Sequence, residues 1–237
     1  MEKTKILLII PAYNEEKSIK KTVDSILNTS YDYIIINDGS TDSTQRILKQ
    51  NNYNHINLIT NLGIGGAVQT GYKYANDNGY DIAIQFDADG QHDMNYIESL
   101  IQPILNQKAN LVIGSCFIEK DPNNQRSSKI RRLGIIFLSN TIKLFSGKKI
   151  YDPTSGFRAA DRKIIELFAN NYPLEYPEPI SNYELLRFSN FTIKEIPVKM
   201  RKRQYGKSSI HSWKSIYAAI NVFLSIIILS LGRKKHD

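Results

Sequence analysis

The sequence predicts an α/β protein with a doubly wound, mostly parallel sheet and flanking helices. Two observations lead to this fold class. Through the first 115 residues, short runs of apolar and β-branched residues alternate with segments of helical spacing, which is typical of successive strand–helix units. The strand-like runs are also apolar throughout, as expected of parallel strands that helices cover on both faces.

The expected elements follow one another in a regular order. Strands are expected at 5–10, 31–38, 55–60, 81–87 and 109–115, with helices between them at 15–28, 40–50, 65–79 and 93–107. Periodic apolar residues give the first helix one apolar face, Ser40 and Thr41 cap the second, and Gly79 ends the third. The N-terminal apolar run is too short for a signal peptide, so we expect it to form the first strand.

The pattern changes beyond about residue 120. Residues 130–147 predict a helix with an apolar face and a basic entrance, whereas 151–161 and 176–184 are rich in turn residues. Residues 192–210 indicate a strand that leads into a basic loop. We therefore expect a catalytic domain over residues 1–210, followed by a separate C-terminal segment.

The C-terminal segment, residues 211–237, combines a hydrophobic helix with a basic tail. The apolar core of residues 215–232 is about 16 residues, shorter than the roughly 20 that cross a bilayer. An interfacial helix and a docking helix for a small membrane protein are both consistent with this composition. Ordinary burial in the core is a third interpretation that stays open.

Composition limits the partners of this 237-residue chain. The single cysteine, Cys116, excludes an internal disulfide framework and a cysteine-based zinc site, and it favours a reducing compartment. The formal net charge of +8 favours anionic partners, namely nucleic acid, a membrane surface or phosphorylated small molecules. Nucleic acid is the weakest of these, because aromatic residues do not interleave with the basic loop in a base-stacking pattern. A basic surface that serves solubility alone is an equally good interpretation.

Unusual polar sequences follow each of the first four expected strands. They are PAYNEE, NDGSTD, NLGIGG and DADGQHD, in chain order. Doubly wound sheets bind ligands at the carboxyl ends of their strands. Four such loops on one edge of the sheet predict a ligand site there.

The loop after the fourth strand has the ligands of a metal site. Asp87, Asp89 and Gln91 can converge on one point, and oxygen ligands of this kind suit Mg²⁺ or Mn²⁺ bridged to substrate phosphates. Helix capping is the alternative, and it accounts for Asp93 but not for two acids directly after an apolar strand. His92 is expected to be solvated or hydrogen-bonded rather than a ligand.

Two further loops carry weaker signals. Asp38 ends the second strand, where an acid can accept hydrogen bonds from a ribose or base, and a turn with a helix cap explains part of the same motif. The glycines that begin at Gly63 do not fit the dinucleotide fingerprint. Close backbone approach to a ligand and tight helix packing explain them equally well.

Taken together and in this spacing, the four loops resemble those of the GT-A glycosyltransferases of family 2. The motifs DPTSGFRA and EIPVKMRKRQYGKSS are similar to those of one branch, the dolichol-phosphate mannose synthases and bacterial polyprenyl-phosphate glycosyltransferases. The resemblance covers about residues 5–210. It implies a metal-dependent, inverting transfer from a nucleotide sugar, with a UDP-sugar favoured, to a polyprenyl phosphate.

The resemblance also implies roles for individual residues. The metal ligands would be Asp89 and Gln91, and the catalytic set would be Asp89, Arg131, Arg203 and Glu178. The nucleotide-sugar contacts would be Pro11, Ala12, Tyr13, Glu15, Asp38, Gly63, Asp87, Ala88 and Lys207. The acceptor phosphate would be bound by Arg126, Arg131, Arg132 and Arg201.

The basic residues accompany apolar ones, as a lipid phosphate requires. The residues that could rest on a bilayer are Ile135, Phe137, Leu138, Ile142, Leu144 and Phe145. An amphipathic core helix is the alternative for them. The loop with Arg201, Arg203 and Lys207 would close over the active site, and a plain solvated turn is its alternative.

The acceptor class depends on whether a general base is present. A sugar hydroxyl must lose its proton as it attacks, whereas a phosphate monoester is already anionic. Family members that act on hydroxyls carry an acidic pair before a helix, but residues 176–184 offer Glu178 between two prolines. This favours the phosphate acceptor. Transfer to a glycan hydroxyl, with Glu178 or Glu184 as base, and a non-catalytic nucleotide-sugar scaffold on the membrane are the alternatives.

Two departures limit the resemblance. The synthase pattern has a lysine at the place of Ser209, and the multi-helix membrane domain of some relatives has no counterpart here. The expected location is the cytoplasmic face of the membrane, in surface polysaccharide synthesis, with an anionic lipid surface attracting the basic tail. The sequence leaves open the sugar, the choice between Mg²⁺ and Mn²⁺, and the oligomeric state.

Overall fold

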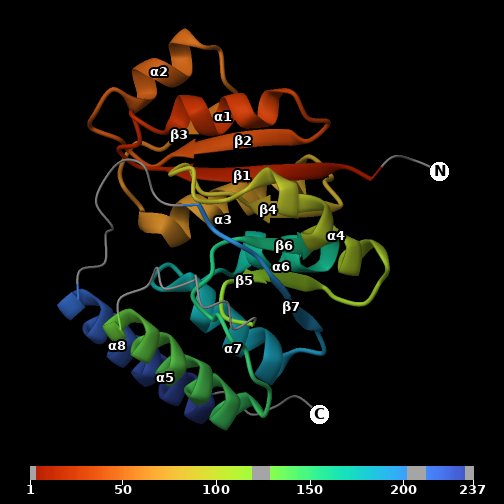
Figure 1. The fold of residues 1–237 in the computed structure, drawn as a ribbon, viewed down its shortest axis with the longest axis vertical. Coiled ribbons are helices and arrows are strands. Elements are labelled where there is room, and N and C mark those ends of the chain that lie inside the picture. The colour runs from red at the N-terminus through yellow and green to blue at the C-terminus, as the bar shows by residue number, and fades with distance from the viewer. Residues whose placement is uncertain (1–3, 119–128, 202–211, 233–237) are drawn as a thin grey trace.

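The computed structural model describes residues 4–118, 129–201 and 212–232. Seven strands in these ranges form one sheet, in the order β3-β2-β1-β4-β6-β5-β7 (Figure 1). The strands are β1 (Ile6–Ala12), β2 (Asp32–Asn37), β3 (His55–Asn57), β4 (Ile82–Gln85), β5 (Leu111–Ser115), β6 (Arg158–Asp161) and β7 (Ile193–Pro197). β3, β2, β1 and β4 are parallel, as are β5 and β7. The predicted α/β class with a mostly parallel sheet is confirmed.

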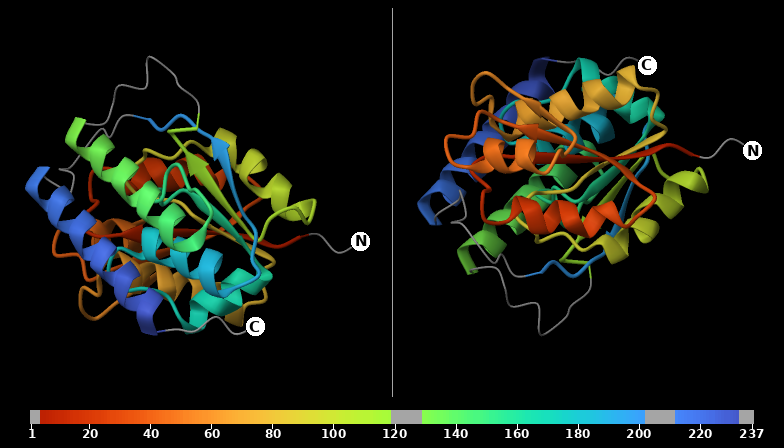
Figure 2. Two further views of the ribbon diagram at one scale, coloured as in Figure 1. Left: turned by 90° about the horizontal axis from the view of Figure 1, so that it is seen from below. Right: turned by 90° about the horizontal axis from the view of Figure 1, so that it is seen from above.

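Helices cover both faces of the sheet (Figure 2). One face packs against α1 (Ile19–Leu27), α2 (Thr44–Gln50) and α4 (Ile97–Leu105), the last preceded by a 3₁₀ turn. The other face packs against α3 (Gly63–Asp77), α5 (Lys129–Ser146), α6 (Arg162–Asn170), α7 (Pro177–Phe188) and α8 (Ser212–Gly232). The two hydrophobic cores therefore lie on opposite sides of the sheet.

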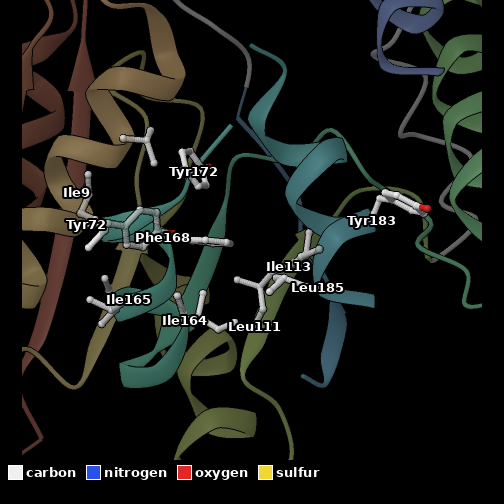
Figure 3. Packing of buried hydrophobic residues seen from close by; sticks show 14 of the residues in the cluster. Ile9, Tyr72, Leu111, Ile113, Ile164, Ile165, Phe168, Tyr172, Tyr183 and Leu185 are labelled. Atoms are coloured by element: carbon white, nitrogen blue, oxygen red, sulfur yellow. The ribbon is translucent and has the colours of Figure 1, made fainter. Parts of the chain in front are cut away.

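The core under α3 and α6 is rich in aromatic rings. Tyr72 packs edge-on against Phe168, with 5.1 Å between ring centroids, and Phe168 packs against Tyr172 at 4.8 Å (Figure 3). Gly71 brings α3 close to the sheet, because a Cβ at this position would lie 2.2 Å from a methyl carbon of Ile9. These contacts hold the middle of α3 against the middle of β1 and against Phe168 of α6.

Strand β6 lies in residues 151–161, which the sequence predicted to be rich in turns. Residues Arg158–Asp161 form a strand that lies antiparallel between β4 and β5. Its residues are small or charged, so it lacks the bulky β-branched residues that mark a strand in a sequence. As a result, β5 does not neighbour β4, although the two are consecutive among the predicted strands.

Helix α7 corrects the expectation that 176–184 is turn-rich. Pro177 is the first residue of the helix, a position at which proline is favoured because its missing N–H would have no partner there. The left-handed Tyr176, with φ 47°, precedes it. The prolines that suggested a turn therefore mark the start of a helix.

Helices α5 and α8 lie side by side, each with a buried and an exposed apolar face (Figures 1 and 2). Ile135, Leu138 and Ile142 of α5 belong to the core, which corrects the expectation that they rest on a bilayer. On α8 the core residues are Ala219, Val222 and Ile226, so core burial holds for one face. The exposed residues are Leu133, Ile136, Phe137 and Leu144 of α5 and Tyr217, Ile220, Leu224, Ile228 and Leu231 of α8.

These exposed residues form what we call the α5–α8 apolar surface. Phe137 joins its two halves by packing on Phe223, with ring centroids 5.5 Å apart. Within the three described ranges, no helix combines the length and the apolarity that crossing a membrane requires.

Candidate active site

The loops after β1 and β2 brace one another at the carboxyl edge of the sheet. The Asn14 side-chain oxygen accepts the Thr41 amide at 2.8 Å, and the Glu15 amide donates to Thr44 Oγ1 at 2.9 Å. Pro11 and Ala12 are buried at the end of β1, while Tyr13 is 48% exposed. Of these three residues Tyr13 alone has an exposed side chain, and its contact with a nucleotide stays a prediction.

Asp38 is buried and fixes the next loop. Its carboxylate accepts the Leu62 amide at 2.7 Å, and burial raises its pKa, an effect that this hydrogen bond opposes. Gly39, with φ +64°, packs so closely that a Cβ would lie 2.8 Å from the Asn61 amide nitrogen. Asp38 thus holds the residues that lead into Gly63 and α3. Its contact with a ribose or base stays a prediction.

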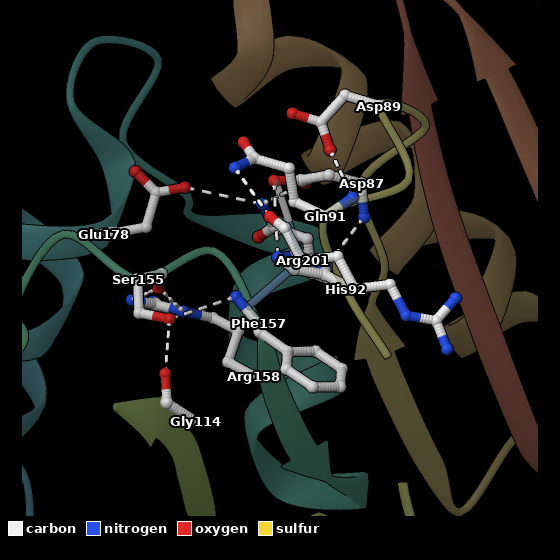
Figure 4. Close-up of polar contacts among 11 residues, drawn as sticks. Asp87, Asp89, Gln91, His92, Gly114, Ser155, Phe157, Arg158, Glu178 and Arg201 are labelled. Carbon is white, nitrogen blue, oxygen red and sulfur yellow. Dashed lines mark hydrogen bonds and ion pairs between the residues drawn. The ribbon is translucent and has the colours of Figure 1, made fainter. Parts of the chain in front are cut away.

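The loop after β4 brings Asp87, Asp89 and Gln91 together (Figure 4). Asp89 Oδ1 accepts the Gln91 amide at 3.0 Å, which orients the carboxylate within the turn. Thr22 Oγ1 of α1 donates to the Ala88 carbonyl at 2.9 Å and ties the turn to that helix. A small cleft of about 90 Å³ opens between α1 and this loop, and Asp89 is one of its lining residues.

The sequence predicted that His92 is either solvated or hydrogen-bonded. In the structure it is hydrogen-bonded and buried. Its side chain is only 2% exposed, and its Nδ1 accepts the Asp87 amide at 2.9 Å. Burial lowers the pKa of His92 to about 4, although the Asp89 charge opposes the shift. The ring is therefore neutral at neutral pH, and its 3.6 Å approach to Asp87 Oδ2 is a polar contact rather than an ion pair.

Behind Asp87 lies a buried polar group that the sequence reasoning missed. Gln85 Nε2 lies 3.4 Å from Asp87 Oδ1 and 3.5 Å from Glu178 Oε1, at the outer limit of hydrogen bonding. Arg158, fully buried, pairs in register with Gln85 and donates to the Ser155 carbonyl and to Ser181 Oγ. A charged residue inside the apolar stretch of the DPTSGFRA motif was the available signal.

Glu178 is in the first turn of α7 and points toward this group (Figure 4). Burial raises the pKa of its carboxyl, and the Arg158 charge opposes that rise. Gly156 keeps the space between the elements small, because a Cβ there would lie 2.7 Å from Gln85 Nε2. The predicted candidates Asp87 and Glu178 are therefore joined through Gln85.

The predicted basic residues are only partly described. Arg201 is in place, but its guanidinium pairs with Asp93 at 2.9 Å, while its amide donates to the Gln91 carbonyl at 2.8 Å. Arg132 is exposed on α5, and its contact with an acceptor phosphate stays a prediction. Of the remaining candidates, Arg126, Arg203 and Lys207 lie outside the described residues. The structure describes only the backbone of Arg131, in α5.

The donor set fits a divalent cation that shares its coordination with substrate. Asp87, Asp89 and Gln91 offer hard oxygen atoms on one loop (Figure 4). In the described parts of the chain, no group of three His, Cys, Asp or Glu residues surrounds a possible metal position. Such a partial set suits Mg²⁺ or Mn²⁺, which keep water and phosphate oxygens as further ligands.

The model of the glycosyl transferase family 2 matches residues 7–168, well over half of the chain. The chain belongs to glycosyltransferase family 2. The match includes β1 to β6 with the loops described above, so this family's shared segment is the one that carries Asp38, Asp87 and Asp89. The protein is accordingly a glycosyltransferase.

Relatives of nearly the same length strengthen the assignment to family 2. The UDP-N-acetylglucosamine–dolichyl-phosphate N-acetylglucosaminyltransferase of Methanococcus voltae is 34% identical, over 96% of this chain and 97% of the relative. The undecaprenyl-phosphate mannosyltransferase of Micrococcus luteus is 26% identical, over 92% of each chain. The polyprenol monophosphomannose synthase of Mycolicibacterium smegmatis is 25% identical, over 86% of this chain and 80% of the relative.

A solved structure confirms the predicted GT-A fold. Glucosyl-3-phosphoglycerate synthase from Mycobacterium tuberculosis, in complex with Mn²⁺, UDP and phosphoglyceric acid, superposes with a TM-score of 0.70. The alignment covers 98% of this chain and 80% of that one, at 19% sequence identity. At this level of identity the likeness extends to the fold alone.

Proposed function

We propose that this protein transfers a sugar from a nucleotide sugar to the phosphate of a polyprenyl phosphate, with inversion at the anomeric carbon. The observation that supports this most is the full-length similarity to the Methanococcus voltae enzyme, whose name gives a dolichyl-phosphate acceptor. A UDP-sugar is the favoured donor for the same reason. The relatives differ in the sugars they are named for, so the sugar is a matter for a donor screen.

The nucleotide would bind across the braced loops after β1 and β2. Tyr13 is exposed there, and Asp38 holds the residues that lead into Gly63. Asp89 and Gln91 would hold Mg²⁺ or Mn²⁺, which supplies positive charge beside the departing diphosphate. Asp87 would line the same place, with its backbone anchored at the end of β4.

The acceptor would attack from the side opposite the diphosphate. A phosphate monoester is anionic at neutral pH, so it needs no residue to remove a proton. This suits Glu178, whose carboxylate is in contact with Gln85 and next to a buried arginine charge rather than in an open cleft. Arg132, exposed on α5, is one of the cations that would attract the lipid phosphate.

The α5–α8 apolar surface would place the protein on the membrane that contains the acceptor. The exposed bases Lys143, Lys148 and Lys149 lie at the C-terminal end of α5 or just after it, and Arg132 lies at the other end. Apolar side chains flanked by cations are typical of helices that bind anionic lipid surfaces. We propose the cytoplasmic face of the membrane and a role in surface polysaccharide synthesis.

The test is a donor screen with purified protein, Mn²⁺ and undecaprenyl phosphate, following radiolabelled sugar into the organic phase. We expect label in that phase with one UDP-sugar, and we expect it to be lost with EDTA or with Asp89→Ala. Label that never enters the lipid, in a protein that still binds nucleotide sugar, would overturn the lipid acceptor and leave a glycan hydroxyl to be tested.

A further inference from the structure

The His92 imidazole is enclosed beneath the loop that carries Asp87 and Asp89, and no step described above uses it. The ring stacks on Phe157, with 4.5 Å between centroids and 17° between planes. Phe86 packs against it edge-on at 5.6 Å. Two aromatic side chains therefore fix the plane of the imidazole, and with it the directions of both ring nitrogens.

One ring nitrogen of His92 is bonded to Asp87. The backbone amide of Asp87 donates to Nδ1 at 2.9 Å, so Nδ1 carries no proton. In a neutral imidazole the proton is then on Nε2. Nε2 lies 3.6 Å from Asp87 Oδ2, beyond hydrogen-bond distance, so the backbone bond at Nδ1 is the contact that ties His92 to Asp87.

We propose that His92 is a positioning residue: a fixed Nε2–H tautomer whose Nδ1 anchors the Asp87 backbone, and with it the place from which the Asp87 side chain reaches the site. The inference rests on the proposed function, because the orientation of Asp87 matters to the reaction only if a metal-bound nucleotide lies beside it. The partners that orient metal-site and nucleotide-site residues typically affect affinity as strongly as some direct ligands do.

Three substitutions separate the backbone hydrogen bond from the packing of the ring. His92→Phe keeps an aromatic ring against Phe157 and removes the acceptor of the Asp87 amide. In His92→Asn the side-chain oxygen takes the place of Nδ1 and can accept from the Asp87 amide. In His92→Gln the amide nitrogen takes the place of Nε2, which leaves the Asp87 amide without the Nδ1 acceptor.

The first readout is the binding of UDP in the presence of Mn²⁺, measured by calorimetry on variants whose melting temperature shows that they are folded. We expect His92→Phe to weaken binding by about 10- to 100-fold. We expect His92→Asn to recover most of this loss, because it restores an acceptor for the 2.9 Å bond from the Asp87 amide, and His92→Gln to recover less. Unchanged binding in His92→Phe, or equal losses in His92→Phe and His92→Asn, would overturn the proposal.

The second readout needs neither metal nor nucleotide. Long-range ¹H–¹⁵N correlation spectra of the histidine-labelled wild-type protein report the tautomer of each of its four histidines. The His92 signal is assigned by its loss in His92→Asn. We expect the Nε2–H tautomer at neutral pH, and an Nδ1–H tautomer or an imidazolium would contradict the proposal even if every variant failed to fold. A wild-type protein with the expected tautomer that binds no nucleotide would instead contradict the proposed function.

Discussion

At the scale of single residues, the active site depends on side chains that touch Asp87 from behind. Gln85 bridges Asp87 and Glu178, and the buried Arg158 supplies the positive charge next to that carboxylate. The Glu178 carboxylate, with its raised pKa, could act as a base. A hydroxyl acceptor would need such a base and a phosphate acceptor would not, so the role of Glu178 distinguishes the two classes of acceptor.

The substitution Glu178→Gln distinguishes a phosphate acceptor from a hydroxyl acceptor. Glutamine keeps the shape and an oxygen that can accept from Gln85, but it cannot remove a proton. With a phosphate acceptor we expect activity close to that of the wild-type protein, measured as initial rate at saturating donor. A loss of about 10²–10⁴-fold, the usual contribution of a general base, would indicate a hydroxyl acceptor instead. The melting temperature serves as the control for folding.

Gly156 gives a second prediction at this scale. A Cβ there would lie 2.7 Å from Gln85 Nε2 and 3.3 Å from Asp87 Oδ2, so alanine must displace one of these side chains. We expect Gly156→Ala to lower kcat/KM by about tenfold or more, which corresponds to about 1.4 kcal/mol. Activity assays on the folded variant check this, and wild-type kinetics would show that the contact has room to relax.

At the scale of secondary-structure elements, α3 meets the segment before α7 through backbone rather than through side chains. A Cβ on Gly65 would lie 2.3 Å from the Leu174 carbonyl oxygen, which cannot move aside as a side chain would. This contact fixes the position of α3 relative to the segment before α7. It thereby also positions Leu62, which precedes α3 and donates to Asp38. The two halves of the site are thereby placed relative to one another.

Paired glycine substitutions in helices test this packing. We expect Gly65→Ala to lower the free energy of unfolding by about 1–3 kcal/mol, the usual cost of overpacking. Gly134→Ala in α5 is the matched control, because nothing lies within 4 Å of its Cβ position. There alanine should stabilise the helix by about 0.5–1 kcal/mol. Urea unfolding of both variants measures the difference, and two equal shifts would contradict the contact.

At the scale of the whole molecule, the polar loops and the α5–α8 apolar surface occupy different parts of the structure. The carboxyl ends of β1, β2 and β4 carry the polar loops, whereas α5 and α8 carry an exposed apolar surface (Figure 1). An enzyme that joins a water-soluble donor to a lipid acceptor needs both, with the reacting phosphate between them. Under the proposed function, the membrane would be part of the functional assembly.

Charge on the α5–α8 apolar surface should release the protein from membranes. We expect Leu224→Glu and Ile228→Glu to lower the fraction that sediments with vesicles of anionic phospholipid, because each places a carboxylate among apolar contacts. Ile59→Glu is the control: Ile59 is fully exposed but follows β3, outside the α5–α8 apolar surface. Equal binding of all three variants and the wild-type protein would contradict a membrane role for this surface.

The sequence by itself determined the fold class, the first five strands and the grouping of four loops at one edge, because hydrophobic periodicity and turn residues are local signals. It also singled out Asp87, Asp89 and Gln91, since acids directly after an apolar strand are costly without a partner. Only the tertiary structure showed that Arg158–Asp161 is a central antiparallel strand, that Arg158 and Gln85 lie behind Asp87, and that His92 is buried. These features depend on contacts between distant segments, and the four small or charged residues of β6 carry no local pattern that could reveal them.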